Sequence, residues 1–137
     1  MASDEMEQRV RGLADREAIR ELPLRYCDCV WRQDAAGIAA LYTEDGSFDF
    51  GLETGPLEGS SAIRDFFVAT FETTQPLPFI HNHVFEVDGD VASGRCSVEI
   101  RLGDDTSMGI YHDNYARVDG QWRFRSRKAT MLTPLPA

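Results

Sequence analysis

Residues 92–102 read ASGRCSVEIRL, a stretch in which apolar and polar side chains alternate. Successive side chains of a strand point to opposite sides of the sheet, so four apolar residues share one face: Cys96, Val98, Ile100 and Leu102. Clean alternation of this length is typical of a strand with one face in the core and the other in water. The stretch therefore predicts a sheet that is covered on one side.

The rest of the second half of the chain continues this pattern. In chain order the further predicted strands are FIHNHVFEV (79–87), SMGIYHDNYARV (107–118) and QWRFRSRKATML (121–132). The sequence Asp-Gly follows two of them, at 88–89 and 119–120. Asp-Gly between alternating segments is the strongest short-range signal for a hairpin. The region predicts an antiparallel meander.

The first half of the chain has the periodicity of helices instead. ADREAIRELPLRYCDCVWRQD (14–34) carries apolar residues at three- and four-residue spacing, with Asp15 as the predicted N-cap. Pro23 lies inside this helix. Because proline lacks the N–H that would bond to the Ile19 carbonyl, we expect a kink or a split there.

Two shorter helices and a strand are predicted next. DAAGIAALYTED (34–45) forms a helix capped by Asp34, GSFDFG (46–51) a short strand, and SSAIRDFFVATFETT (60–74) a helix capped by Ser60 or Ser61. This order predicts an α+β fold, with the helices gathered on one face of a curved antiparallel sheet. The 137 residues suit one domain, 1–137, with an N-terminal extension at 1–13 and a C-terminal tail at 129–137.

Composition excludes several classes of partner. The formal net charge is −9, which argues against nucleic acid or an anionic membrane, because both require a basic surface. No apolar segment approaches the roughly 20 residues of a membrane span. The charged start and the odd count of three cysteines predict a reduced, cytoplasmic protein.

Six segments in this order resemble the SnoaL-like family, within the cone-shaped fold of nuclear transport factor two. They are REAIREL leading into Tyr26, Asp34 at the second helix, LYTEDGSFDF, PLEGSSAIRDFF, HNHVFEVDGDVASGR and YHDNYARVDGQWRFRSR, and together they span roughly residues 14–128. The resemblance implies an apolar pocket between the helices and the concave face of the sheet, with no cofactor and no metal. Its members include polyketide cyclases, scytalone dehydratase and a dehydrochlorinase.

The dehydratase-like members pair an Asp on the first helix with a His at the start of a strand. When the chain is aligned with this pattern on Tyr26 and Asp34, Trp31 occupies the position of the family's Asp. Aligned on Asn82, the His position holds Pro78. A buried Asp without its His is a costly unpaired charge, so the joint loss suggests that proton abstraction by this dyad has been given up.

Other residues offer a substitute for the dyad. Asp28 neighbours Trp31 on the helix, and a bulge in the strand would bring His81 to the role expected at position 78. The alternative is that these side chains are exposed. His81, His83 and His112 also suggest a metal site, although two histidines separated by one residue are a weak signal.

Tyr26, Tyr111 and Arg127 occupy positions that line the pocket in relatives. They would donate hydrogen bonds to a ligand oxygen, or else they are core residues, with Arg127 paired to an acid such as Asp113. An apolar lining is expected from Phe48, Cys27, Met108 and Met131.

Three functions follow as hypotheses. The first is a cofactor-free lyase or isomerase acting on an apolar cyclic molecule, with Tyr26, Asp28, His81 and Arg127 as its catalytic residues. The second is a binding protein that kept the pocket, with Trp31, Pro78 and Asn82 in its lining, and lost the chemistry. The third is an interaction protein that uses the sheet face to form a homo-oligomer, a dimer or a trimer.

Overall fold

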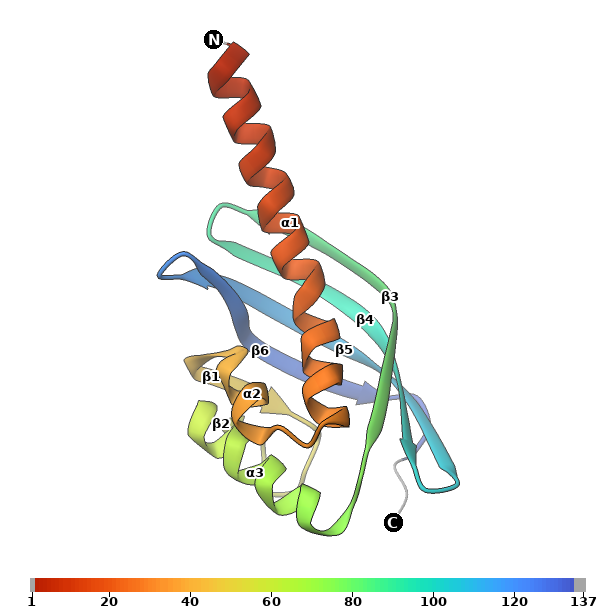
Figure 1. Ribbon diagram of the computed structural model, residues 1–137. Coiled ribbons are helices and arrows are strands. Elements are labelled where there is room, and N and C mark those ends of the chain that lie inside the picture. Colours follow the sequence, from red (N-terminus) through yellow and green to blue (C-terminus); the bar gives the residue numbers. More distant parts are fainter. Residues whose placement is uncertain (1, 135–137) are drawn as a thin grey trace.

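The computed structural model describes residues 2–134 and shows three helices beside one sheet (Figure 1). The helices are α1 (Ala2–Trp31), α2 (Ala35–Ala40) and α3 (Ser60–Thr73). The strands are β1 (Tyr42–Asp49), β2 (Leu57–Glu58), β3 (Leu77–Asp88), β4 (Val91–Leu102), β5 (Asp105–Val118) and β6 (Gln121–Met131). The α+β class expected from the sequence is confirmed, and α1 crosses the face of the curved sheet in Figure 1.

The six strands lie in the order β2-β1-β6-β5-β4-β3. The meander β3 to β6 is antiparallel throughout, as predicted. β1 differs, because it pairs with β6 in parallel, with Phe48 opposite Arg127. The sheet is therefore mixed. Strand β6 connects β1 and β2, from the first half of the chain, to the antiparallel strands of the second half.

The turn between β5 and β6 confirms the Asp-Gly signal. Asp119 and Gly120 have φ of 51° and 78°, the positive values that a tight two-residue hairpin turn requires and that glycine adopts without strain.

A bulge in β3 decides which of its side chains face the helices. The β3–β4 register shifts between His81 and Val84, and Asn82 has φ of 54°. Before the bulge the buried residue is Pro78, whereas after it His83 and Phe85 are the half-buried ones and Val84 is exposed. The extra residue thus switches the inward-facing set from even to odd positions.

Helix α1 departs from the sequence prediction at two residues. It begins at Ala2, so Asp15 lies inside it and is no N-cap. The Asp15 carboxylate instead accepts hydrogen bonds from Arg117 (2.6 Å) and from the Trp122 indole (3.0 Å), which fasten the helix to β5 and β6. The helix also continues through Pro23, whose buried ring packs in the core and offsets one missing backbone hydrogen bond.

The other helix starts give one confirmed and one wrong prediction. Asp34 caps α2, since its carboxylate accepts the Gly37 N–H at 2.8 Å. The cap of α3 is Gly59, and no side chain caps that helix, so the expected role of Ser60 or Ser61 is not found. Part of the expected tail, 129–131, belongs to β6, and residues 135–137 lie outside the described residues.

The core fills the space between α1, α3 and the sheet. Its fully buried side chains include Ile19, Ile38, Phe48, Ile63 and Phe124. Within residues 2–134, no helix is both long and apolar enough to cross a membrane.

Candidate functional site

An apolar cavity of about 180 Å³ lies between α1, α3 and the sheet. Its lining combines aliphatic, aromatic and threonine side chains from both halves of the chain: Tyr26, Val30, Phe50, Leu52, Phe66, Phe67, Thr70, Thr74, Pro76, Pro78, Ile100, Leu102, Tyr111 and Met131. Among these described lining residues there is no carboxylate and no imidazole. The cavity can therefore hold an apolar body, and its polar groups are hydroxyls.

Two phenols are the most deeply buried polar groups of this lining. The rings of Tyr26 and Tyr111 meet edge to face, with centroids 5.9 Å apart, and both residues are at most 2% exposed. Burial raises the pKa of Tyr26 well above its usual value and also raises the pKa of Tyr111, although the nearby Arg127 works against both shifts. Both phenols therefore keep their protons at neutral pH and can donate hydrogen bonds.

Trp31 and Pro78 lie side by side near this cavity. The Trp31 indole N–H donates to the Pro78 carbonyl at 2.9 Å, and its ring meets that of Phe79 edge to face at 5.3 Å. Pro78 lines the cavity, whereas Trp31 is 44% exposed and does not. The helix position and the strand position that the resemblance pairs are thus in direct contact, and they are joined by a hydrogen bond without acid–base chemistry.

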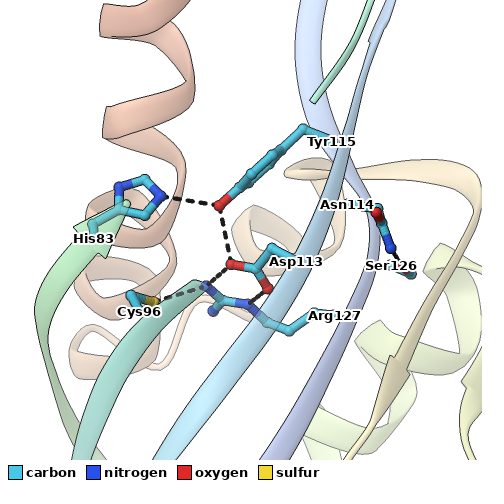
Figure 2. Close-up of polar contacts among 7 residues, drawn as sticks. All are labelled: His83, Cys96, Asp113, Asn114, Tyr115, Ser126 and Arg127. Carbon is cyan, nitrogen blue, oxygen red and sulfur yellow. Dashed lines mark hydrogen bonds and ion pairs between the residues drawn. The ribbon is translucent and has the colours of Figure 1, made fainter. Parts of the chain in front are cut away.

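A buried polar network adjoins the two phenols through Arg127. Figure 2 shows the side chains of this network. Arg127 makes two hydrogen bonds to Asp113, at 2.8 and 2.9 Å, and both side chains are completely buried. The Tyr115 hydroxyl donates to Asp113 at 3.1 Å and contacts His83 Nε2 at 3.0 Å. Because that hydroxyl has one proton, His83 must carry its own on Nε2, which leaves Nδ1 as an acceptor without a partner.

The charges in this network are set by burial and by the ion pair. Burial alone would lower the pKa of Arg127, but the Asp113 carboxylate outweighs it and raises that pKa. The guanidinium also lies over the rings of Tyr111 (4.0 Å) and Tyr26 (4.7 Å). Burial lowers the pKa of His83, against the attraction of Asp113. Arg127 is thus a core cation that supports the phenols from behind and does not itself line the cavity.

Several residues expected at the site lie elsewhere. Asp28 is on the exposed side of α1, paired with Arg32 at 2.9 Å. His81 and Asn82 are exposed, because the bulge directs His83 inward instead. Met108 is 49% exposed, because side chains along β5 point alternately to the two faces of the sheet and the odd-numbered ones, such as Tyr111, face the core.

Phe48 is fully buried one layer behind the cavity, stacked on Phe50, which lines it. The structure thus brings Tyr26, Tyr111, Pro78 and Met131 together at the cavity and leaves the other expected residues, Cys27 included, outside its lining.

Other lining residues escaped the sequence analysis. The inward stripe of α3, with Phe66, Phe67 and Thr70, could have been assigned to the lining, because its spacing already indicated the buried face. Leu52 sits in an irregular loop and had no such signal. Within residues 2–134, no three His, Cys, Asp or Glu side chains are placed to hold a metal ion.

The comparisons with known proteins agree with this architecture. The sequence profile of the SnoaL-like domain matches residues 11–128. No curated protein matches the chain. A protein of unknown function from Mycobacterium tuberculosis is 31% identical, with a TM-score of 0.79 over 87% of this chain and 77% of that one.

Two enzyme-named structures share the fold. A hexachlorocyclohexane dehydrochlorinase, LinA type 2, is 22% identical with a TM-score of 0.79, over 93% of each chain. A candidate scytalone dehydratase from Novosphingobium aromaticivorans is 21% identical with a TM-score of 0.78, over 89% of this chain and 87% of that one.

Proposed function

The chain belongs to the SnoaL-like family, and on that premise we propose that it is a binding protein for a small cyclic molecule that carries one oxygen. The observation behind this proposal is the lining of the cavity, which is apolar except for threonines and the phenols of Tyr26 and Tyr111. The apolar walls would take the ring of the ligand, and a buried phenol would donate to its oxygen.

The volume of the cavity limits the size of the ligand. A cavity of roughly 150 Å³ lined by apolar side chains is known to accept benzene, whereas pockets for drug-sized molecules measure about 300 Å³ or more. At about 180 Å³, this cavity suits one ring with a small substituent. A four-ring steroid exceeds it.

The chemistry of the lining favours binding over catalysis. Elimination and isomerisation both need a group that accepts a proton, and buried phenols with raised pKa values are donors. A lyase or isomerase is the second candidate, supported by the names of the dehydrochlorinase and the scytalone dehydratase. It would require a base outside the described lining.

Thermal unfolding with phenol, cyclohexanone and a steroid tests the proposal. We expect the one-ring compounds to raise Tm and the steroid to have no effect, because ligands stabilise the state that binds them. Ile100→Trp should abolish the shift by filling the cavity. The control is Ile110→Trp, because Ile110 has the opposite parity to Tyr111 in β5 and so points to the outer face of the sheet.

Two results would contradict the proposal. One is a set of one-ring compounds that leave Tm unchanged in the unaltered chain. The other is a shift that Ile100→Trp preserves, which would place the bound compound outside this cavity.

A further inference from the structure

The outward face of α1 carries an apolar stripe that the fold leaves uncovered. Met6, Val10 and Leu13 are 59, 57 and 68% exposed, and their part of the helix projects beyond the sheet (Figure 1). Farther along, Leu24 and Trp31 are 54 and 44% exposed. At 100° per residue, these five side chains fall within an arc of about 60°. A stripe on a projecting helix indicates a partner rather than the helix's own core.

The spacing of the stripe is that of a helix–helix seam. Its positions advance by alternate steps of four and three residues: Met6, Val10, Leu13, Glu17, Arg20, Leu24, position 27 and Trp31. Cys27 itself is buried in the core of its own chain, so it takes no part in the exposed stripe. An average step of 3.5 residues is the repeat with which two helices pack side by side over a long distance. The two central positions, Glu17 and Arg20, carry opposite charges, so the seam suits a partner with the reverse order of charge at its middle.

We propose that α1 pairs with α1 of a second copy of this chain, in an antiparallel arrangement around a two-fold axis between residues 18 and 19. Leu13 then faces the partner's Leu24, and Met6 faces the partner's Trp31. The projecting part of α1 in each copy, which carries Met6, Val10 and Leu13, thereby covers the exposed Leu24 and Trp31 of the other copy. A two-fold interface uses the same patch on both copies, so this one helix supplies both sides.

The charges on the helix agree with this register. In the antiparallel pair, a residue of one copy lies level with the residue of the other copy for which the two residue numbers add up to 37. Four such levels join two charged residues, and each joins opposite signs: Glu5 with Arg32, Arg9 with Asp28, Arg16 with Glu21, and Glu17 with Arg20. A parallel pair would instead bring each of these charges against its own copy. Electrostatic complementarity thus selects the antiparallel register.

The eight charged side chains are at least partly exposed, and those of Arg16 and Arg20 also lie over the Phe85 ring of their own chain, at 4.8 and 5.3 Å. Arg32 and Asp28 form a pair within the helix, as do Arg25 and Glu21, but all four side chains are at least 42% exposed. Exposed pairs of this kind contribute little and rearrange easily. This interface does not depend on the cavity, so its failure would leave the proposed binding function unaffected.

Sedimentation equilibrium on the full chain tests the pairing. We expect a dimer that Glu17→Arg weakens by about tenfold, because the two-fold axis doubles the new repulsion with the partner's Arg20. Combining Glu17→Arg with Arg20→Glu should restore the dimer, since the two signs are then exchanged on both copies. Val84→Glu, on the exposed outer face of the sheet, is the control and should leave the dimer unchanged.

Cysteine cross-linking tests the register directly. In the proposed arrangement, Leu13→Cys and Leu24→Cys proteins form a disulfide when mixed and oxidised, and neither forms one alone. A monomer at every concentration overturns the proposal. So does an assembly that Glu17→Arg leaves intact, one that Val84→Glu dissociates, or a Leu13→Cys protein that cross-links to itself.

Discussion

Arg127 and Asp113 form the one ion pair among residues 2–134 in which both side chains are completely buried. Two desolvated charges are held there because the carboxylate takes two hydrogen bonds from the guanidinium and a third from Tyr115. Replacing such a pair with apolar side chains is often tolerated, whereas removing one partner leaves an uncompensated charge. The pair is therefore vulnerable to single substitutions.

Asp113→Leu should lower the free energy of unfolding by about 3–5 kcal/mol, because it strands a buried guanidinium. Urea denaturation measures the change. Adding Arg127→Met should recover a large part of the loss, since no charge is then left in the core. A double variant as unstable as the single one would show that packing, and not charge, dominates at this place.

His83 predicts how stability depends on pH. Burial lowers its pKa in the folded chain below the ordinary value of 6.5, so the unfolded chain binds the proton more readily. The contribution of neutral His83 to stability is therefore fully present above about pH 6.5. It is lost as the pH falls from the pKa of His83 in the unfolded chain to its lower pKa in the folded chain. We expect Tm to decrease over this range, and His83→Gln to reduce the slope. An equal slope in the variant would assign the effect to other groups.

At the scale of elements, the sequence predicts local structure well and long-range pairing poorly. Asp34 and the Asp119-Gly120 turn act through their nearest neighbours, so their signals were readable. Asp15 has the side chain of an N-cap, but its partners Arg117 and Trp122 are more than a hundred residues away. The β3 bulge and the exposure of Asp28 likewise depend on tertiary packing that no local pattern contains, and they decide which predicted site residues reach the cavity.

The start of α2 gives a prediction at this scale. Asp34→Ala should cost about 1 kcal/mol of unfolding free energy, because the Gly37 N–H loses its acceptor. Asp34→Asn is the matched control, since asparagine caps helices about as well as aspartate. Chemical denaturation of the two variants compares them, and an equal loss in both would point to the charge of Asp34 rather than to its cap.

At the scale of the whole molecule, the site depends on how α1 docks on the start of β3. The hydrogen bond from Trp31 to the Pro78 carbonyl fixes that contact. Side chains placed at these two positions should therefore interact directly, even though 47 residues separate them along the chain.

Introducing Trp31→Asp together with Pro78→His tests this docking. The imidazole at position 78 should titrate at a higher pKa in the double variant than with Pro78→His alone, because a neighbouring carboxylate favours its charged form. An NMR titration over neutral pH measures both. Equal values in the two variants would mean that the positions do not meet in solution.

The parallel pairing of β1 with β6 has a consequence for synthesis of the chain. Phe48 lies opposite Arg127, so this part of the sheet stays unfinished until β6 has left the ribosome. Contacts this distant in sequence close late and slow folding. Until then, β1 and β5 lack the strand that lies between them, and unpaired strand edges of this kind make a nascent chain prone to aggregation.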